Sequence, residues 1–260
     1  MSVSPIHTKI WLEEPEVDNP FATRAAYCHG YDVYGQMLGK AGWADMVFLL
    51  FRGEAPDATQ AQLLTTLAVA LANPGPRDPA VHAAMCGGVG GSTAASSLMA
   101  ALAVGAGQCG GAREVYLAMQ AWVDCGMNLP RWQHRIASPP WARDDVWPVP
   151  DHPIGFDPRG VTTSTLVRQA LDALACLLPG ARLSWLQAHR EALESAAQRP
   201  VAFTLVVATA LADLGFSAQE GEMLHLILRL PGAAAHALEQ AHYGFKRFPF
   251  PRIELEDAPA

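Results

Sequence analysis

The sequence predicts a mainly α-helical protein, and three observations support this. Apolar residues recur at three- and four-residue intervals in Ala- and Leu-rich stretches. Several of these stretches begin with residues whose side chains cap free amide groups. Runs of alternating apolar and polar residues, which would predict strands, are almost absent. We therefore expect the 260 residues to form helices in one large domain or two coupled ones.

Four apolar stripes predict individual helices in chain order. The first runs from Leu63 to Leu71, and the second covers 166–178, where Pro179-Gly180 ends it. The third covers 203–214 and stops at Gly215. The fourth, over 223–230, is apolar nearly all round, so we expect that helix to be deeply buried.

Helix starts are marked by three capping patterns. Asp57-x-x-Gln60, Ser184-x-x-Gln187 and Ser217-x-x-Glu220 each place a short acceptor three residues before a Glu or Gln that can reach back to it. Each pattern predicts the first turn of a helix.

Two stretches break the helical pattern. Leu129–Gly160 holds seven prolines, so a long loop is predicted there. The tail Lys246–Ala260 is also rich in proline and is expected to be extended or frayed. A shorter break is predicted at Pro231-Gly232, after Arg229.

Composition excludes several classes of protein. Half of the residues are apolar and 17% are charged, which excludes a disordered chain. The net charge of −7 argues against nucleic acid or an anionic membrane as a partner. The polar-free stretches are too short to span a membrane, and no signal peptide is readable. Five cysteines without a CxxC pair predict reduced thiols and a cytoplasmic protein.

Three segments carry candidate chemistry. In 151–160, His152 can polarise a carbonyl or transfer a proton, and Arg159 can hold a carboxylate; the alternative is a network that only fixes the loop. In 228–240, Arg229 either pairs with an internal acid or faces a ligand, and His236 is either a ligand contact or a packing residue. In 105–113, the glycines around Cys109 allow the backbone to approach a ligand closely. Scattered histidines predict no metal site.

These segments, in this order, resemble the citrate synthase and citryl-CoA lyase family. The likeness extends through most of the chain and consists of short pieces in register. They are His29-Gly30-Tyr31-Asp32 for the family's "RGYD", 43–56 for a helix and its exit, Cys109-Gly110-Gly111-Ala112 for "HGGA", His152-Pro153 with Asp157-Pro158-Arg159 for "GHP…DPR", Asp213-Leu214-Gly215-Phe216 for "DLGF", and 229–239 for "R-x-x-G-x-x-AH-x-E".

The resemblance implies an all-α homodimer with a large and a small helical domain. Residues 1–160 and 220–260 would form the large domain, with an active-site loop at 129–160, and 161–219 the small one. It also implies a reaction that makes or breaks a C–C bond between an acyl-CoA and a 2-oxo acid. The expected small molecules are a coenzyme A thioester, as substrate, and a carboxylated partner, without a metal.

Residue by residue, the resemblance implies these roles. His152 matches the family's ketone-polarising histidine, and Arg159 and Arg229 match carboxylate-binding arginines; His236 would join them, and Gly110 and Gly111 would contact coenzyme A. Cys109 stands where the family has the histidine that enolises the thioester, and Thr204 falls near the position of its proton-removing aspartate. Cys109 could replace these groups only as a thiolate, which needs a cationic neighbour.

Two main hypotheses follow. The chain is an enzyme of this kind with altered chemistry, in which His152 and Cys109 are catalytic. Alternatively, it is a non-catalytic homologue that binds a CoA ester or carboxylate, or a regulatory partner of an active paralogue. A scaffold without a small-molecule site is a third interpretation, which the Arg and His residues of otherwise apolar segments disfavour.

Overall fold

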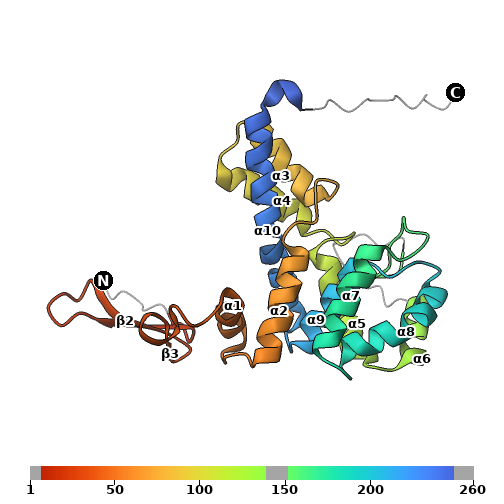
Figure 1. Ribbon diagram of the computed structural model, residues 1–260, viewed down its shortest axis with the longest axis horizontal. Coiled ribbons are helices and arrows are strands. Elements are labelled where there is room, and N and C mark those ends of the chain that lie inside the picture. The colour runs from red at the N-terminus through yellow and green to blue at the C-terminus, as the bar shows by residue number, and fades with distance from the viewer. Residues whose placement is uncertain (1–6, 139–151, 249–260) are drawn as a thin grey trace. The chain divides into compact units, whose positions relative to one another are not determined.

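A computed structural model describes residues 7–138 and 152–248 of the chain. The strands are β1 (Trp11–Pro15), β2 (Thr23–Cys28) and β3 (Tyr31–Asp32). The helices are α1 (Trp43–Arg52), α2 (Ala58–Leu71), α3 (Pro79–Val89), α4 (Ala94–Gly105), α5 (Ala112–Cys125), α6 (Leu129–Ala137), α7 (Thr165–Leu177), α8 (Arg182–Ala197), α9 (Phe203–Asp213) and α10 (Ala218–Tyr243), with short helical turns η1 (Val33–Met37) and η2 (Phe245–Arg247). The prediction of a mainly helical protein is confirmed (Figure 1).

The chain divides into two compact units, each built from two segments. Unit 1 comprises Met1–Ala70 and Gln108–His225, and unit 2 comprises Leu71–Gly107 and Leu226–Ala260. The domain boundaries expected from the sequence stay a prediction. Among the described residues, no helix is both long and apolar enough to cross a membrane.

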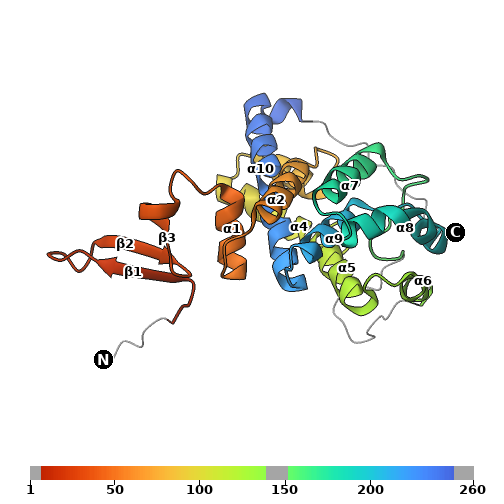
Figure 2. The same ribbon diagram turned by 60° about the horizontal axis from the view of Figure 1, so that its bottom comes forward.

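Unit 1 begins with a small antiparallel sheet that the sequence pattern did not predict. Its strand order is β1-β2-β3 (Figure 2). In the pairing of β1 with β2, Trp11 lies opposite Cys28. A two-residue turn at His29-Gly30 joins β2 to β3, and both residues have positive φ, as tight hairpins require. The strands are short, and only Ala26 and Cys28 are buried in them, so no clear alternation marks them in the sequence.

Helix α9 is central to unit 1. Every residue from Thr204 to Leu211 is buried, and α5, α7 and α8 pack against this helix. Trp122 of α5 donates an indole hydrogen bond to Thr209 Oγ1 at 2.9 Å. The same tryptophan meets Trp132 of α6 and Trp185 of α8 edge-on, which joins four helices in one aromatic core.

Two of the three predicted capping patterns are confirmed. Asp57 Oδ1 accepts from the Gln60 amide at 2.8 Å, and Ser217 Oγ accepts from the Glu220 amide at 3.3 Å. The Ser184 prediction is wrong, because α8 already begins at Arg182. Its first amides, of Arg182 and Leu183, donate to the Asp213 carboxylate at 3.0 and 2.9 Å.

The loop predicted over 129–160 is corrected at its start, where 129–137 form α6. Asn128 caps this helix by accepting from the Arg131 amide at 3.0 Å, and Pro130 lies in the first turn, where its missing N–H costs nothing. Residues 139–151 of the predicted loop lie outside the described residues.

Unit 2 packs α3 and α4 side by side, with the second half of α10 against them (Figure 1). Asp78 caps α3 by accepting from the Ala80 amide at 3.0 Å. Gly88 leaves no room for a side chain, because an added Cβ would lie 2.0 Å from the Ala237 carbonyl oxygen. Small residues therefore set the close spacing of these helices.

Helix α10 continues through Pro231, so the break predicted there is wrong. The Gly232 amide donates to the Ala72 carbonyl at 2.7 Å, so a tertiary contact satisfies it within unit 2. The predicted deep burial of 223–230 is also only partly right. Leu224 and Leu228 are buried, whereas Met223 is 60% exposed.

Candidate active site

The first part of the candidate site is the turn that leads into α5. Gly110 has φ +75°, a conformation that favours glycine, and Gly111 forms the extended N-cap of the helix. Glu114 lies in the first turn, and its Oε2 accepts from the Gly110 amide at 2.7 Å. The carboxylate thereby fixes the turn that carries Cys109.

The second part is the turn 152–156, which comes from far along the chain. Gly155 there has φ +84°, and its amide donates to Glu114 Oε1 at 2.9 Å. The same turn is bound to the segment before α9: the Ala202 amide donates to the Gly155 carbonyl at 2.9 Å, and Phe156 pairs with Val201. Glu114 thus connects two turns and lies beside the start of α9.

Burial and charge at this point make Glu114 unusual. The residue is 1% exposed, and desolvation raises the pKa of its carboxyl above the ordinary 4.5. The Gly155 and Gly110 amides, the charge of His152 and the Thr204 side chain act in the opposite direction on this pKa. The position in the first turn of α5 also favours a negative charge. The site therefore holds a buried acid whose protonation depends on its neighbours.

Two further polar side chains are buried at the same place. His152 is 7% exposed, and its charge acts on the Glu114 carboxyl. Thr204 is 6% exposed and lies beside that carboxyl, yet its hydroxyl has no hydrogen bond of normal geometry among the described residues. Burying a hydroxyl without a well-formed hydrogen bond costs free energy, so Thr204 is an unusual third polar side chain in this buried group.

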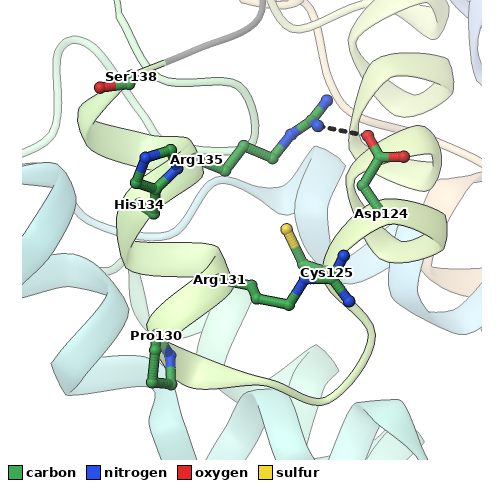
Figure 3. A pocket seen from close by; sticks show the side chains of 7 residues that line it. All are labelled: Asp124, Cys125, Pro130, Arg131, His134, Arg135 and Ser138. Carbon is green, nitrogen blue, oxygen red and sulfur yellow. Dashed lines mark hydrogen bonds and ion pairs between the residues drawn. The ribbon is translucent and has the colours of Figure 1, made fainter.

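A cavity of 410 Å³ lies elsewhere in unit 1, between the end of α5 and α6 (Figure 3). Its lining includes Arg131, His134 and Arg135, and the last of these pairs with Asp124 at 2.5 Å. The lining carries more positive than negative charge. None of the residues expected to be functional lines this cavity.

Comparisons with known proteins address the fold. The structure superposes on citryl-CoA lyase from Hydrogenobacter thermophilus with a TM-score of 0.75, 16% identity, and coverage of 98% of this chain and 96% of that one. The chain has the citryl-CoA lyase fold. No protein-family model and no curated protein sequence matches it.

The citryl-CoA lyase fold also occurs within longer chains. ATP citrate lyase from Methanothrix soehngenii, in complex with citrate and coenzyme A, matches with a TM-score of 0.71 and 14% identity over 99% of this chain and 43% of that one. A mutant of the Methanosaeta concilii ATP citrate lyase, in complex with (3S)-citryl-CoA, matches with a TM-score of 0.70 at 14% identity. The fold expected from the sequence resemblance is confirmed.

Of the residues predicted to be functional, those of unit 1 fall in two groups. His152 and the turn of Cys109, Gly110 and Gly111 come together through Glu114. Cys109 is a free, exposed thiol at the edge of this group. Arg159 is exposed, and its amide donates to Asp157 Oδ1 at 2.8 Å, so it shares the turn segment with His152 but stays at the surface.

Arg229 and His236 belong to unit 2. The Arg229 guanidinium pairs with Asp78, the residue that caps α3, so the interpretation as an internal ion pair fits the structure. His236 Nε2 lies 3.2 Å from Asn73 Oδ1, and its Nδ1 lies 3.4 Å from Glu239. Their roles in substrate binding stay predictions.

The sequence patterns did not single out Glu114, whose carboxylate connects the turns of Cys109 and His152. A signal was present, because this acid stands three residues after Gly111 at the start of an otherwise largely apolar helix. The signal was weak, since an acid in the first turn of a helix is also ordinary capping chemistry.

Proposed function

We propose that the chain makes or cleaves a C–C bond between an acyl-CoA and a 2-oxo acid, with chemistry altered from that of citrate synthase. The observation that carries the proposal is the buried group of His152, Glu114 and Thr204, set in a whole-length citryl-CoA lyase fold. Relatives of this fold hold citrate and coenzyme A, and we extend that substrate class to this chain.

In the cleavage direction, the chemistry assigns a proton transfer to His152. The hydroxyl of a 3-hydroxy-acyl-CoA loses its proton to the imidazole and becomes the carbonyl of the 2-oxo acid. The C–C bond breaks, and its electron pair passes to the thioester as an enolate. A proton then returns to the α-carbon from the thiol of Cys109, which is exposed in the adjoining turn. The imidazolium of His152 passes its proton to the resulting thiolate through water, which restores both groups for the next turnover. Synthesis reverses these steps.

Binding of the substrate carboxylates is assigned to the arginines. Arg159 is exposed, and an arginine can hold a carboxylate by two parallel hydrogen bonds. Arg229 is held by Asp78, so substrate must compete with that ion pair for its guanidinium. A homodimer without a metal and a cytoplasmic location complete the proposal.

The decisive experiment is a substrate screen. The pure protein is incubated with acetyl-, propionyl- and citryl-CoA, with and without oxaloacetate and pyruvate, while mass spectrometry follows free CoA and new acids. We expect turnover, and we expect His152→Ala and Cys109→Ser to abolish it. Cys176→Ser is the matched control for Cys109→Ser, because both thiols are exposed and Cys176 lies outside the group. His134→Ala is a control for loss of a histidine outside the group.

A second candidate function is binding without catalysis. Both Glu114 oxygens accept backbone amides and Arg229 is paired, which favours a static ligand site. In that case the screen shows no turnover, and a CoA ester raises the melting temperature of the protein. If neither turnover nor stabilisation occurs, the acyl-CoA site is wrong.

A further inference from the structure

Glu114 has a geometry that a helix cap alone does not require. A capping acid satisfies amides of its own helix end, as Asp57 does for Gln60. Glu114 instead divides its two oxygens between the Gly110 amide and the Gly155 amide, 41 residues away. Its carboxylate is the polar connection between the Cys109 turn and the His152 turn.

The charge of His152 also reaches Glu114. The two side chains are 1% and 7% exposed, so little water screens one from the other. The charge of His152 lowers the pKa of the Glu114 carboxyl, against the larger raising effect of desolvation.

We propose that Glu114 is a positioning residue that acts through His152, because its carboxylate holds the turn of the imidazole and the turn of Cys109 together. The catalytic part of this inference rests on the proposed function. The connection between the two turns does not, because it is a property of the free protein.

Two variants separate charge from shape. Glu114→Gln keeps the shape but removes the negative charge, and one of the two amides then faces an NH2 group instead of an acceptor. Glu114→Asp keeps the charge but shortens the side chain by one CH2, so it no longer reaches both turns. Glu222→Gln is the control, because Glu222 is another acid of unit 1, and its carboxylate lies 3.9 Å from the Arg113 guanidinium.

The first readout is amide hydrogen exchange in the full-length protein, followed by NMR. We expect the Gly110 and Gly155 amides to exchange faster in Glu114→Gln and in Glu114→Asp than in the wild type, because at least one of them loses its acceptor. Glu222→Gln should exchange as the wild type does. Unchanged exchange at both glycines in folded Glu114→Gln overturns the proposal.

If Glu114→Gln does not fold, the wild-type protein decides. The two hydrogen bonds to Glu114 predict that the Gly110 and Gly155 amides are both protected from exchange in the native protein. Rapid exchange of either amide in the wild type overturns the proposal.

The second readout is catalysis. We expect kcat to fall about tenfold or more in Glu114→Gln, because a displaced His152 turn misplaces the imidazole, while the affinity for a CoA ester stays within about twofold. Equal kcat values in the two proteins would overturn the catalytic role. An inactive wild type would instead refute the proposed function and leave the exchange result standing.

Discussion

Gly155 allows the sharpest test of how the His152 turn is held, because the chain offers a matched control. Both Gly155 and Gly180 lie in the left-handed region, with φ +84° and +82°. An added Cβ at Gly155 would lie 2.9 Å from Leu205 Cβ on α9, whereas at Gly180 nothing lies within 4 Å. Alanine at either position therefore meets the same backbone strain, and only Gly155→Ala adds a clash.

The expected losses follow from these distances. The left-handed backbone costs alanine about 1–2 kcal/mol at both sites. The clash adds about 1–3 kcal/mol at Gly155, because Leu205 Cβ is fixed to the backbone and cannot rotate away. Gly155→Ala should therefore unfold more easily than Gly180→Ala by about 1–3 kcal/mol, or by at least about 2 °C in Tm.

The assay is urea unfolding followed by tryptophan fluorescence, which reports on Trp122, Trp132 and Trp185 in the core of unit 1. Equal losses in the two variants would refute the packing of the turn against α9. A larger loss in Gly180→Ala would refute it more strongly, since the exposed position offers no clash.

Three further predictions concern other parts of unit 1. Because burial raises the pKa of Glu114, the folded state holds the proton of this carboxyl more tightly than the unfolded state does. The protonated carboxyl therefore contributes its full stability below about pH 4.5. This contribution is lost as the pH rises through the pKa of Glu114 in the folded state. Urea unfolding at several pH values should show this slope in the wild type and a flatter one in Glu114→Gln, and parallel slopes would contradict it. The exposed Cys109 should react rapidly with a thiol reagent in the native protein. Cys28 and Cys125 are buried, and burial raises the pKa values of their thiols, so they should react only on unfolding. Mass spectrometry of the labelled peptides measures the order of labelling, and labelling of Cys125 before Cys109 would be evidence against the packing. Asp213→Ala should lower the free energy of unfolding by about 2 kcal/mol, which is the upper end for a helix cap. The Asp213 side chain is 2% exposed, and its carboxylate accepts hydrogen bonds from two amides of α8. A loss below about 0.5 kcal/mol in chemical denaturation would contradict this role of Asp213.

The predictable part of the fold is the part that local sequence determines. The leucines of the Leu63–Leu71 stripe are buried on one face of α2. The helix caps at Asp57 and Ser217 form as the sequence predicts. Each of these features depends on residues within one or two helical turns. These features need no knowledge of the rest of the chain.

The parts that failed depend on contacts between distant segments. Asp213 caps a helix that begins 31 residues earlier in the chain. The first amides of this helix therefore bind Asp213 and not Ser184, and no local sequence pattern indicates this acceptor. Pro231 does not end α10, because Ala72 accepts the amide of the following glycine.

The candidate site shows the same division. The turns of His152 and Cys109 stand out in the sequence by their composition. Their connection through Glu114 depends on where residue 155 meets residue 114, which spacing along the chain does not reveal.

The construction of unit 2 from two separate segments has a consequence during synthesis. Helices α3 and α4 leave the ribosome long before the second half of α10, because all of Gln108–His225 is made in between. At roughly 5–20 residues per second this delay is on the order of ten seconds. During that time Val81, Ala84 and Met85, which the finished unit buries in a cluster with Ala233 and Ala237, lack their partner. The nascent chain therefore exposes the apolar face of the α3–α4 helix pair during this time. We expect a chaperone that binds short apolar segments to bind there.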